Sequence, residues 1–363
     1  MTESDIKHQL AKTLPLSEAA VEACATADAM VGNTLKGKYR ITGILAEGGM
    51  GRIYTAEHVS LSRKVAVKVV LPELSAHADI VNPFRLEAQL CAQLSHPNVV
   101  SLLDFGQRSA AEGGELYAVM ELVEGPTLEE MLGDEAPFEF RRVAGLMEQL
   151  LIALEYAHEN GVVHRDVKPA NVVVQTTESG AERVKLIDFG IAQAQLNAGR
   201  RSSIVSGTPE YMAPEQALGA AATASVDIYA AGVVLFQLLT GSVPFFGASV
   251  SQVLGRHLTI DRPDPRIVAP ERNIPNAFAV ACMRAMALEA DDRFPTAADF
   301  ADALVRARRE LSSKAPQNAG GELSGARQNT SRPPPLASKA PLASSRYSVT
   351  SGVGPRNRSK APD

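Results

Sequence analysis

The sequence is poor in cysteine. Its three cysteines, Cys24, Cys91 and Cys282, stand far apart in 363 residues. An odd number of widely spaced cysteines excludes a disulfide framework and lacks the close pairs of a structural zinc site. We expect the three to be small buried hydrophobic residues in a protein of a reducing compartment.

The chain also lacks a long apolar run. The longest one, Ile228–Leu239, is too short to span a bilayer and contains Gln237. The N-terminus has no apolar core like that of a signal peptide. We therefore expect a cytoplasmic protein without a membrane partner.

An excess of basic charge is absent as well. Lys and Arg number 36 against 41 Asp and Glu, which gives a formal net charge of −5. This balance argues against a nucleic acid partner. Hydrophobic residues make up 45% of the chain, enough for a sizeable core, and the length allows about two domains.

The chain does contain one stretch rich in reactive side chains, residues 162–191. Two short β-branched runs, Val172–Val174 and Val184–Ile187, are separated by a polar segment with Ser179-Gly180 at its turn, which predicts a β-hairpin. A loop precedes the hairpin and a second loop follows it. The first carries His164, Arg165, Asp166, Lys168 and Asn171, and the second carries Asp188, Phe189 and Gly190.

The hairpin folds the chain back on itself, so that Asp166, Asn171 and Asp188 can converge. Carboxylate and amide oxygens suit Mg²⁺, which shares its remaining coordination sites with water and phosphate. Three such side chains at one point are what a phosphoryl-transfer centre needs.

At this point the chain resembles a known family. HRDVKPAN followed by DFG is similar to the catalytic core of protein kinases, over roughly Val31 to Leu311. The phrases EGGMGRIY, GTPEYMAPEQALG and VDIYAAGVVLFQLLTGSVPF, and the absence of tryptophan, resemble the bacterial eukaryotic-like (Hanks-type) serine/threonine kinases.

The resemblance implies an α+β, bilobal protein-kinase-like fold. A small antiparallel β-sheet lobe with one key helix, at about 37–121, would precede a larger, mainly helical lobe at about 125–312. Residues 31–312 would then form the kinase domain. Residues 1–30 would be an extension, in which Ser17–Met30 could form one amphipathic helix, and residues 313–363, rich in Ser, Pro, Ala and Arg, should be disordered.

A glycine-rich turn joins the first two predicted strands of the small lobe, Tyr39–Leu45 and Gly51–His58. Glycines at a hairpin tip can mean only a tight turn. Here Lys68 in VAVK follows, which favours a loop whose main-chain N–H groups approach phosphates. The turn consists of Ala46, Glu47, Gly48, Gly49, Met50 and Gly51. Ala46 replaces the first glycine of the family, so we expect altered loop mobility or nucleotide affinity.

Lys68 lies in an apolar strand, where an unpaired ammonium would be costly to bury. The resemblance supplies two kinds of anion, the α- and β-phosphates of ATP and a helix carboxylate. Glu87 in FRLEAQLCAQL is the expected ion-pair partner, with Asp79 and Glu73 as weaker rivals.

The other roles also come from the resemblance. The main chain of Glu121 and Val123 would hydrogen-bond the adenine, Met120 would line the back of that pocket, and the ATP site would be completed by Ile53, Ala66 and Val173. Asp166 would orient the substrate hydroxyl and accept its proton, and Lys168 would neutralise charge on the γ-phosphoryl. Asn171 and Asp188 would hold Mg²⁺, and Lys168-Pro169 favours Ser or Thr as acceptor.

An activation segment would run from Asp188 to Glu215. Thr208 would bond to Asp166 and Lys168, Glu215 would pair with Arg293, and Asp227 would cap main-chain groups of the catalytic loop. Arg165 would await an anion, which a phosphorylated loop residue could supply. The candidate phosphosites, with ordinary polar loop residues as the alternative reading, are Ser202, Ser203 and Ser206.

The sequence therefore predicts a serine/threonine protein kinase that uses ATP and Mg²⁺, phosphorylates proteins, and also autophosphorylates within a transient homodimer. Three other classes remain as alternatives: a catalytically inactive scaffold of this fold, a nucleotide-binding interaction module without transfer, and a small-molecule kinase of the antibiotic-modifying kind. The inactive classes would have lost Lys68, Asp166 or Asp188, all of which are present. The small-molecule class would not be expected to keep HRDVKPAN, GTPEY and APE together.

Ala46→Gly tests the departure in the glycine-rich turn. We expect the KM for ATP to change only a few-fold, because the flanking Gly48 and Gly51 are kept. Steady-state kinetics with varied ATP measures this. An inactive wild type that the substitution rescues would contradict the expectation.

Overall fold

The computed structural model describes part of the chain: residue 28 and residues 30–48, 51–75, 78–109, 113–135, 137–189, 208–259 and 261–313. The chain divides into two units, Met1–Ala315 and Pro316–Asp363. Every described residue belongs to the first unit. The expected tail at 313–363 lies outside the described residues except for its first residue, as do Cys24 and nearly all of the expected N-terminal helix.

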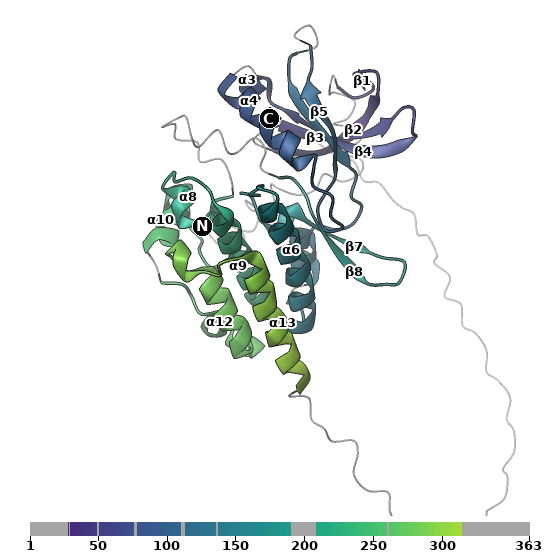
Figure 1. Ribbon diagram of the computed structural model, residues 1–363. Coiled ribbons are helices and arrows are strands. Elements are labelled where there is room, and N and C mark those ends of the chain that lie inside the picture. The colour runs from purple at the N-terminus through teal and green to yellow at the C-terminus, as the bar shows by residue number, and fades with distance from the viewer. Residues whose placement is uncertain are drawn as a thin grey trace, which may run out of the picture. The chain divides into compact units, whose positions relative to one another are not determined.

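A six-stranded antiparallel sheet forms from the first part of the chain, in the order β1-β2-β3-β4-β6-β5 (Figure 1). Burial alternates along β2, so that alternate side chains of this strand face a core and solvent, whereas β4 and β6 are buried on both faces. The strands are β1 Thr34–Leu35, β2 Tyr39–Gly48, β3 Gly51–His58, β4 Arg63–Val70, β5 Leu102–Gln107 and β6 Leu116–Glu121.

Each face of the sheet has its own core. One face packs around a cluster that includes Ile41, Tyr54 and Val67. The other packs Val70, Leu116 and Ala118 against Phe84 of helix α4, Ala78–Cys91. This helix is the one helix expected in the small lobe, and it brings Glu87 toward the centre of the molecule.

The strand expected at Val99–Phe105 begins later than predicted, at Leu102. Val99 instead forms an isolated bridge with Leu186, and the Val100 N–H donates to the Leu186 carbonyl over 2.9 Å. The Val100 N–H is therefore bonded to the catalytic hairpin, while the Val99 N–H donates to the His96 carbonyl over 3.1 Å.

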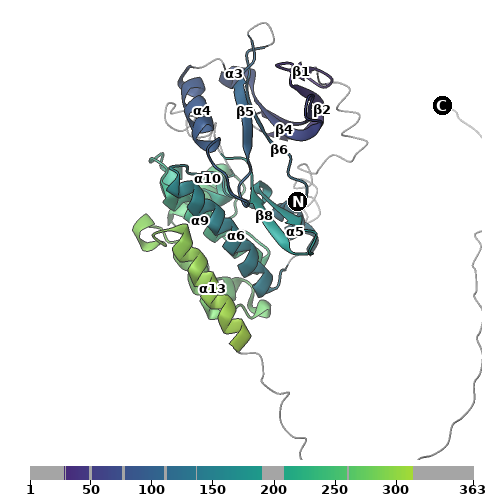
Figure 2. The ribbon, with the colours of Figure 1, turned by 45° about the vertical axis from the view of Figure 1, so that its right-hand side comes forward.

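The second part of the chain is mainly helical. Helix α9, Ala224–Thr240, is apolar on nearly all sides and buried, as its sequence predicts, and α13 packs along α6 while α12 packs against α9 (Figures 1 and 2). Besides α4 and α9, the described helices are α3 Pro72–Ser75, which precedes α4, and α5 Leu128–Glu135, α6 Phe140–Glu159, α8 Pro214–Ala217, α10 Val250–Thr259, α11 Pro265–Val268, α12 Asn276–Ala285 and α13 Ala297–Ser313.

A buried ion pair confirms one predicted contact in this helical part. Arg293 is 1% exposed, and its two terminal nitrogens lie 2.7 and 2.8 Å from the two carboxylate oxygens of Glu215. The guanidinium also donates to the main-chain carbonyls of Ala287 and Leu288. Such full hydrogen bonding is what allows an arginine to be buried.

Two further expectations concern cysteine and membranes. Cys91 and Cys282 are buried and free, as predicted. Within the part of the chain that the structure describes, every helix is too short or too polar to cross a membrane.

Candidate functional site

The catalytic loop is held by one buried carboxylate. Asp227 is 1% exposed and accepts the main-chain N–H groups of His164 and Arg165, each over 2.7 Å. His158 Nε2 lies 2.8 Å from the same carboxylate. The predicted capping role of Asp227 is confirmed.

Two residues of the site have left-handed backbone conformations. Arg165 has a φ of 65° and Asp188 a φ of 59°. A residue with a Cβ adopts this region at a cost, and it persists only where surrounding contacts impose it. For Arg165 that contact is the hydrogen bond to Asp227. Strain of this kind is typical of functional sites.

The predicted hairpin is present and joins the two loops. Its strands, β7 Val172–Thr176 and β8 Glu182–Leu186, pair in register with Val172 opposite Leu186. Just outside the hairpin, the Ile187 N–H donates to the Asn171 carbonyl over 2.9 Å. The residue before Asp188 therefore lies directly against Asn171.

Asp166 lies at the centre of a polar cluster. Its Oδ2 is 2.8 Å from Lys168 Nζ and accepts a 3.0 Å hydrogen bond from Asn171 Nδ2. Lys168 Nζ also donates to Thr208 Oγ1 over 3.0 Å. The predicted contact of Thr208 with Lys168 is thus present.

The ion pairs around Lys68 and Glu87 differ from the prediction. Lys68 pairs with Asp188, and Glu87 pairs with Arg165. The expected pair between Lys68 and Glu87 is wrong for this structure, and the anion that Arg165 was expected to await is Glu87 itself. The physical reason is that a partly buried charge forms an ion pair with the nearest group of opposite charge. For Lys68 this group is Asp188, and for Glu87 it is Arg165.

Burial leaves the Glu87 carboxylate in an unfavourable environment. Burial raises the pKa of Glu87 to about 7, against the opposing effect of the Arg165 guanidinium. Its side chain is 14% exposed. A raised pKa means that the surroundings stabilise the ionised carboxylate poorly, so a second cation can compete with Arg165 for it.

A small cavity of about 30 Å³ lies beside the pair of Lys68 with Asp188. Residues of the sheet and of α4 line it, and its lining includes three of the predicted site residues. Phe189 lines it, and its ring lies 4.7 Å from the ring of His164, so both rings have the packing role predicted for them. The lining residues are Lys68, Val70, Phe84, Cys91, Val100, Leu102, Ala118, Met120, Asp188 and Phe189.

Two glycines of the glycine-rich turn, Gly48 and Gly51, occupy their positions for different physical reasons. Gly51 has a φ of 154°, and a Cβ there would lie 2.0 Å from the Val69 carbonyl oxygen, so packing against β4 requires glycine. At Gly48 a Cβ would meet nothing closer than 4.0 Å. The fold does not explain Gly48, and close approach of a ligand would. Gly49 and Met50 lie outside the described residues.

The expected hinge follows β6. Glu121 accepts from the Ser101 N–H over 2.7 Å and from Lys185 Nζ over 2.6 Å. Although burial opposes them, these contacts lower the pKa of Glu121. The Glu121 side chain is thereby turned toward β8, a contact that the sequence did not suggest because Lys185 looks like an ordinary strand lysine.

The remaining predicted nucleotide residues lie on neighbouring strands. Ile53 pairs with Lys68, and Ala66 pairs with Met120. Val123 packs against the large core beneath the connector, and Val173 of β7 bridges to Thr127. Ser202, Ser203 and Ser206, expected as phosphosites, lie outside the described residues.

Comparison with known proteins is decisive for the family. The model of the protein kinase domain family matches residues 39–299. The chain belongs to the protein kinase family. The expected α+β fold, with an antiparallel sheet followed by a helical lobe, is confirmed. Members of this family use ATP with a divalent metal ion, typically Mg²⁺, and act on protein substrates.

Similar kinases come from several bacteria. The serine/threonine-protein kinase pkn3 of Myxococcus xanthus is 40% identical over 278 residues, which cover 75% of this chain and 50% of the relative. PrkC of Bacillus subtilis is 36% identical over 75% of this chain and 40% of its own length. PknB of Mycobacterium tuberculosis is 35% identical over 81% and 48%, respectively. The chain thus spans about half the length of these curated relatives.

Solved kinase domains have the same fold. The crystal structure of the Mycobacterium tuberculosis PknI kinase domain superposes with a TM-score of 0.61 at 29% sequence identity. The match covers 77% of this chain and 99% of that domain.

The raised pKa of Glu87 predicts a pH-dependent stability. Because the folded-state pKa of about 7 exceeds the ordinary value of 4.5, stability present below pH 4.5 is lost as the pH rises through 7. The free energy of unfolding of wild type minus that of Glu87→Gln should fall by about 1 to 3 kcal/mol between pH 5 and pH 8. Urea denaturation at several pH values measures it.

The control for this series is Glu124→Gln, which removes the same charge from a side chain that is 77% exposed. The difference in free energy of unfolding between wild type and Glu124→Gln should stay constant over the same pH range. A difference for Glu87→Gln that is equally flat, or that grows with pH, contradicts the assignment.

Proposed function

We propose that this chain is an ATP-dependent serine/threonine protein kinase, which transfers the γ-phosphoryl group of ATP to Ser or Thr of protein substrates. The observation that carries the proposal is the cluster in which Lys168 Nζ joins Asp166 Oδ2, at 2.8 Å, to Thr208 Oγ1, at 3.0 Å. That cluster ties the catalytic loop to the segment on which a substrate would dock.

Asp166 would orient the substrate hydroxyl and accept its proton. The transition state of phosphoryl transfer is loose, so positioning contributes more than base strength. Asn171 Nδ2 donates a hydrogen bond to the Asp166 carboxylate over 3.0 Å and another to the Asp166 main-chain carbonyl over 2.7 Å. Lys168 would stabilise the negative charge on the transferred group.

Mg²⁺ fits the donors that Asn171 and Asp188 provide. The Asn171 amide nitrogen faces Asp166, so the amide oxygen is directed away from it. Mg²⁺ sites at phosphates use one or two protein oxygens, with the remaining sites filled by phosphate and water. This agrees with the lack, among residues 28–313 as far as they are described, of any cluster of three or more His, Cys, Asp or Glu ligands. When bound, the ion would neutralise phosphate charge.

ATP would lie between the sheet and the catalytic loop. Main-chain N–H groups near Gly48 would contact its phosphates, and Lys68 would leave Asp188 to bind the α- and β-phosphates. The main chain of Glu121 and Val123 would bind the adenine. The remaining proposed contacts are Ala46, Glu47, Gly49, Met50, Gly51, Ile53, Ala66, Met120 and Val173.

Regulation would use the ion pairs that the structure shows. In the active arrangement Glu87 would leave Arg165 for Lys68, and a phosphorylated residue of the activation segment would replace Glu87 at Arg165. Ser202, Ser203 and Ser206 are the proposed phosphosites, modified within a transient homodimer. The raised pKa of Glu87 agrees with a weakly held first partner.

We place the kinase domain at residues 31–312 and the protein in the cytoplasm, without nucleic acid or membrane partners. Ser and Thr are the proposed acceptors because Lys168-Pro169 resembles serine/threonine kinases and because the similar bacterial proteins are named as such.

The direct test is an assay of the full chain with labelled ATP, Mg²⁺ and a generic protein acceptor. Lys68→Met and Asp166→Asn should each lose activity by about 100-fold or more, because each removes a group that acts on the transferred phosphoryl or its acceptor. Phosphoamino acid analysis should show label on Ser and Thr.

Lys64→Met is the matched control. Lys64 lies on the same strand, β4, but its side chain is 78% exposed, so this variant should keep wild-type activity. A wild type that labels no more acceptor than Asp166→Asn would identify an inactive scaffold. Label on tyrosine alone would contradict the proposed acceptor.

A further inference from the structure

A short turn precedes the sheet and is organised by Asp28. Its Oδ1 accepts the Met30 N–H over 2.7 Å, and its carbonyl accepts the Val31 N–H over 3.1 Å. The Asn33 N–H then donates to the Met30 carbonyl over 3.1 Å. We call Asp28 together with residues 30–33 the N-terminal turn.

The N-terminal turn is fastened to β2 by main-chain bonds. The Gly32 N–H donates to the Ile41 carbonyl over 3.0 Å, and the Ile41 N–H donates to the Asn33 carbonyl over 2.9 Å. Met30 and Val31 pack against the core on this face of the sheet.

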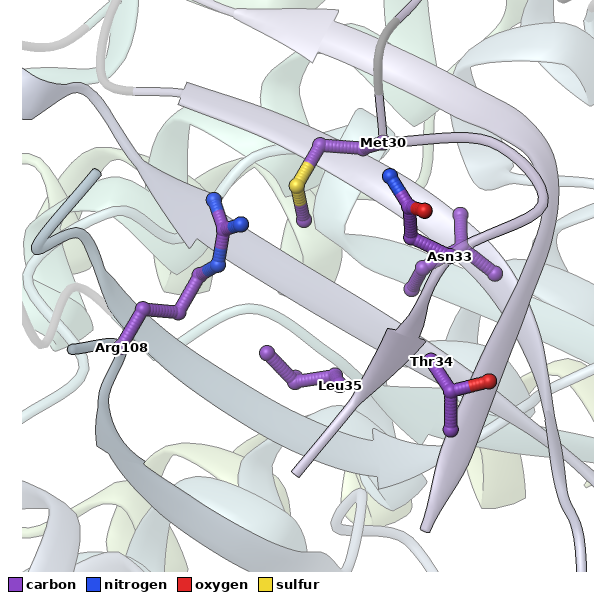
Figure 3. Close-up of a pocket in the computed structure, with 6 residues that line it drawn as sticks. Met30, Asn33, Thr34, Leu35 and Arg108 are labelled. Carbon is purple, nitrogen blue, oxygen red and sulfur yellow. The ribbon is translucent and has the colours of Figure 1, made fainter. Parts of the chain in front are cut away.

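Packing on one side of this turn is incomplete. A cavity of about 250 Å³ lies beside Met30, larger than the cavity at Lys68. Figure 3 shows Met30, Asn33, Thr34, Leu35 and Arg108 around it. The polar contacts of Asp28 therefore add to the main-chain bonds and to the packing of Met30 and Val31 in attaching the turn.

Asp28 also reaches the glycine-rich turn. Its Oδ2 accepts from Arg52 over 2.7 Å and from the Tyr54 hydroxyl over 3.0 Å. Arg52 Nε in turn lies 2.6 Å from Glu47 Oε1. One arginine therefore joins the N-terminal turn to both strands of the hairpin.

The position of these contacts along the hairpin is informative. Glu47 pairs with Arg52, and the next pair toward the tip is Gly48 with Gly51. The contact between Arg52 and Glu47 thus crosses the hairpin one residue pair before the last pair at the tip, Gly48 with Gly51. A change in the twist between β2 and β3 at this pair would move Arg52 relative to Glu47.

Burial distinguishes this network from an ordinary surface ion pair. An exposed pair contributes little, and the side chains of Arg52 and Glu47 are each 48% exposed. The Asp28 side chain is only 6% exposed and has three donors. A buried and fully hydrogen-bonded carboxylate is a fixed point to which the exposed pair is attached.

We propose that Asp28 is a positioning residue for the nucleotide, which acts through Arg52 and Glu47 to hold the glycine-rich turn over the phosphates of ATP. This rests on the proposed kinase function. A turn held in its binding conformation binds with a smaller loss of conformational freedom, and therefore more tightly. On this account Asp28 supports the ATP site without contacting the nucleotide.

Asp28→Asn in the full chain is the test. The dissociation constant of Mg-ATP by calorimetry and the KM for ATP should both rise about three- to tenfold, the effect of losing one partly exposed ionic contact, while kcat stays within about twofold. Simple electrostatics predicts the opposite, because removing a negative charge near an anionic ligand should tighten binding.

Glu57→Gln is the matched control. It removes the same charge from β3, the strand that carries Arg52, at the end away from the glycine-rich turn, and should leave the KM for ATP unchanged. If Asp28→Asn lowers only the melting temperature, with KM and dissociation constant unchanged, Asp28 is merely structural and the proposal is overturned.

A double-mutant cycle with Arg52→Gln tests the route of the effect. Each single variant should weaken ATP binding, and the double variant should weaken it no further than the stronger single one. Additive effects would overturn the proposal. Nucleotide binding is measured separately from phosphoryl transfer. A wild type that binds ATP without phosphorylating protein would refute the proposed function. The ratio of the dissociation constants of Asp28→Asn and wild type would still test the role of Asp28.

Discussion

The Asp227 carboxylate is the constraint on which the catalytic site depends. It is buried in α9 and accepts two consecutive main-chain N–H groups of the catalytic loop. A buried carboxylate must be hydrogen-bonded, and the two N–H groups that it accepts here fix the loop with Arg165 in a left-handed conformation. The same loop continues with Asp166, Lys168 and Asn171, so fixing the loop also sets the positions of these residues.

The second half of the site is positioned by the hairpin that follows. The bond from the Ile187 N–H to the Asn171 carbonyl makes the loop with Asp188 adjacent to the catalytic loop. Lys68 joins from the sheet by pairing with Asp188. Three separate segments thus supply one polar centre. Hydrogen bonds to main-chain groups hold the two loops, and β4 is held by its pairing with β3 and β6. That leaves the reactive side chains available for exchange of partners.

The sequence was sufficient wherever a strong local pattern coincided with a motif. The hairpin and the apolar helix α9 followed from local patterns, and the cap by Asp227 and the pair of Glu215 with Arg293 followed from the family resemblance. The partner of Glu87 was not predictable. Lys68 and Arg165 are both cations near α4, and which of them Glu87 takes depends on the placement of a helix and two loops, which no spacing in the sequence records.

Asp28 shows the other limit of sequence reasoning. It lies in an extension without a motif, and its partners Arg52 and Tyr54 are surface-type residues of a strand. Only the folded sheet brings these residues together. By contrast, Gly51 was attributed to phosphate binding by resemblance, and the structure adds a second reason, close packing against the Val69 carbonyl.

The central claim is that Asp188, and not Asp166, holds the metal ion beside ATP. The most direct measurement is the gain in ATP affinity on adding Mg²⁺, determined by calorimetry for wild type, Asp188→Asn and Asp166→Asn. The account predicts that wild type and Asp166→Asn show the gain and that Asp188→Asn loses most of it. An equal gain in all three proteins would contradict the assignment of the site.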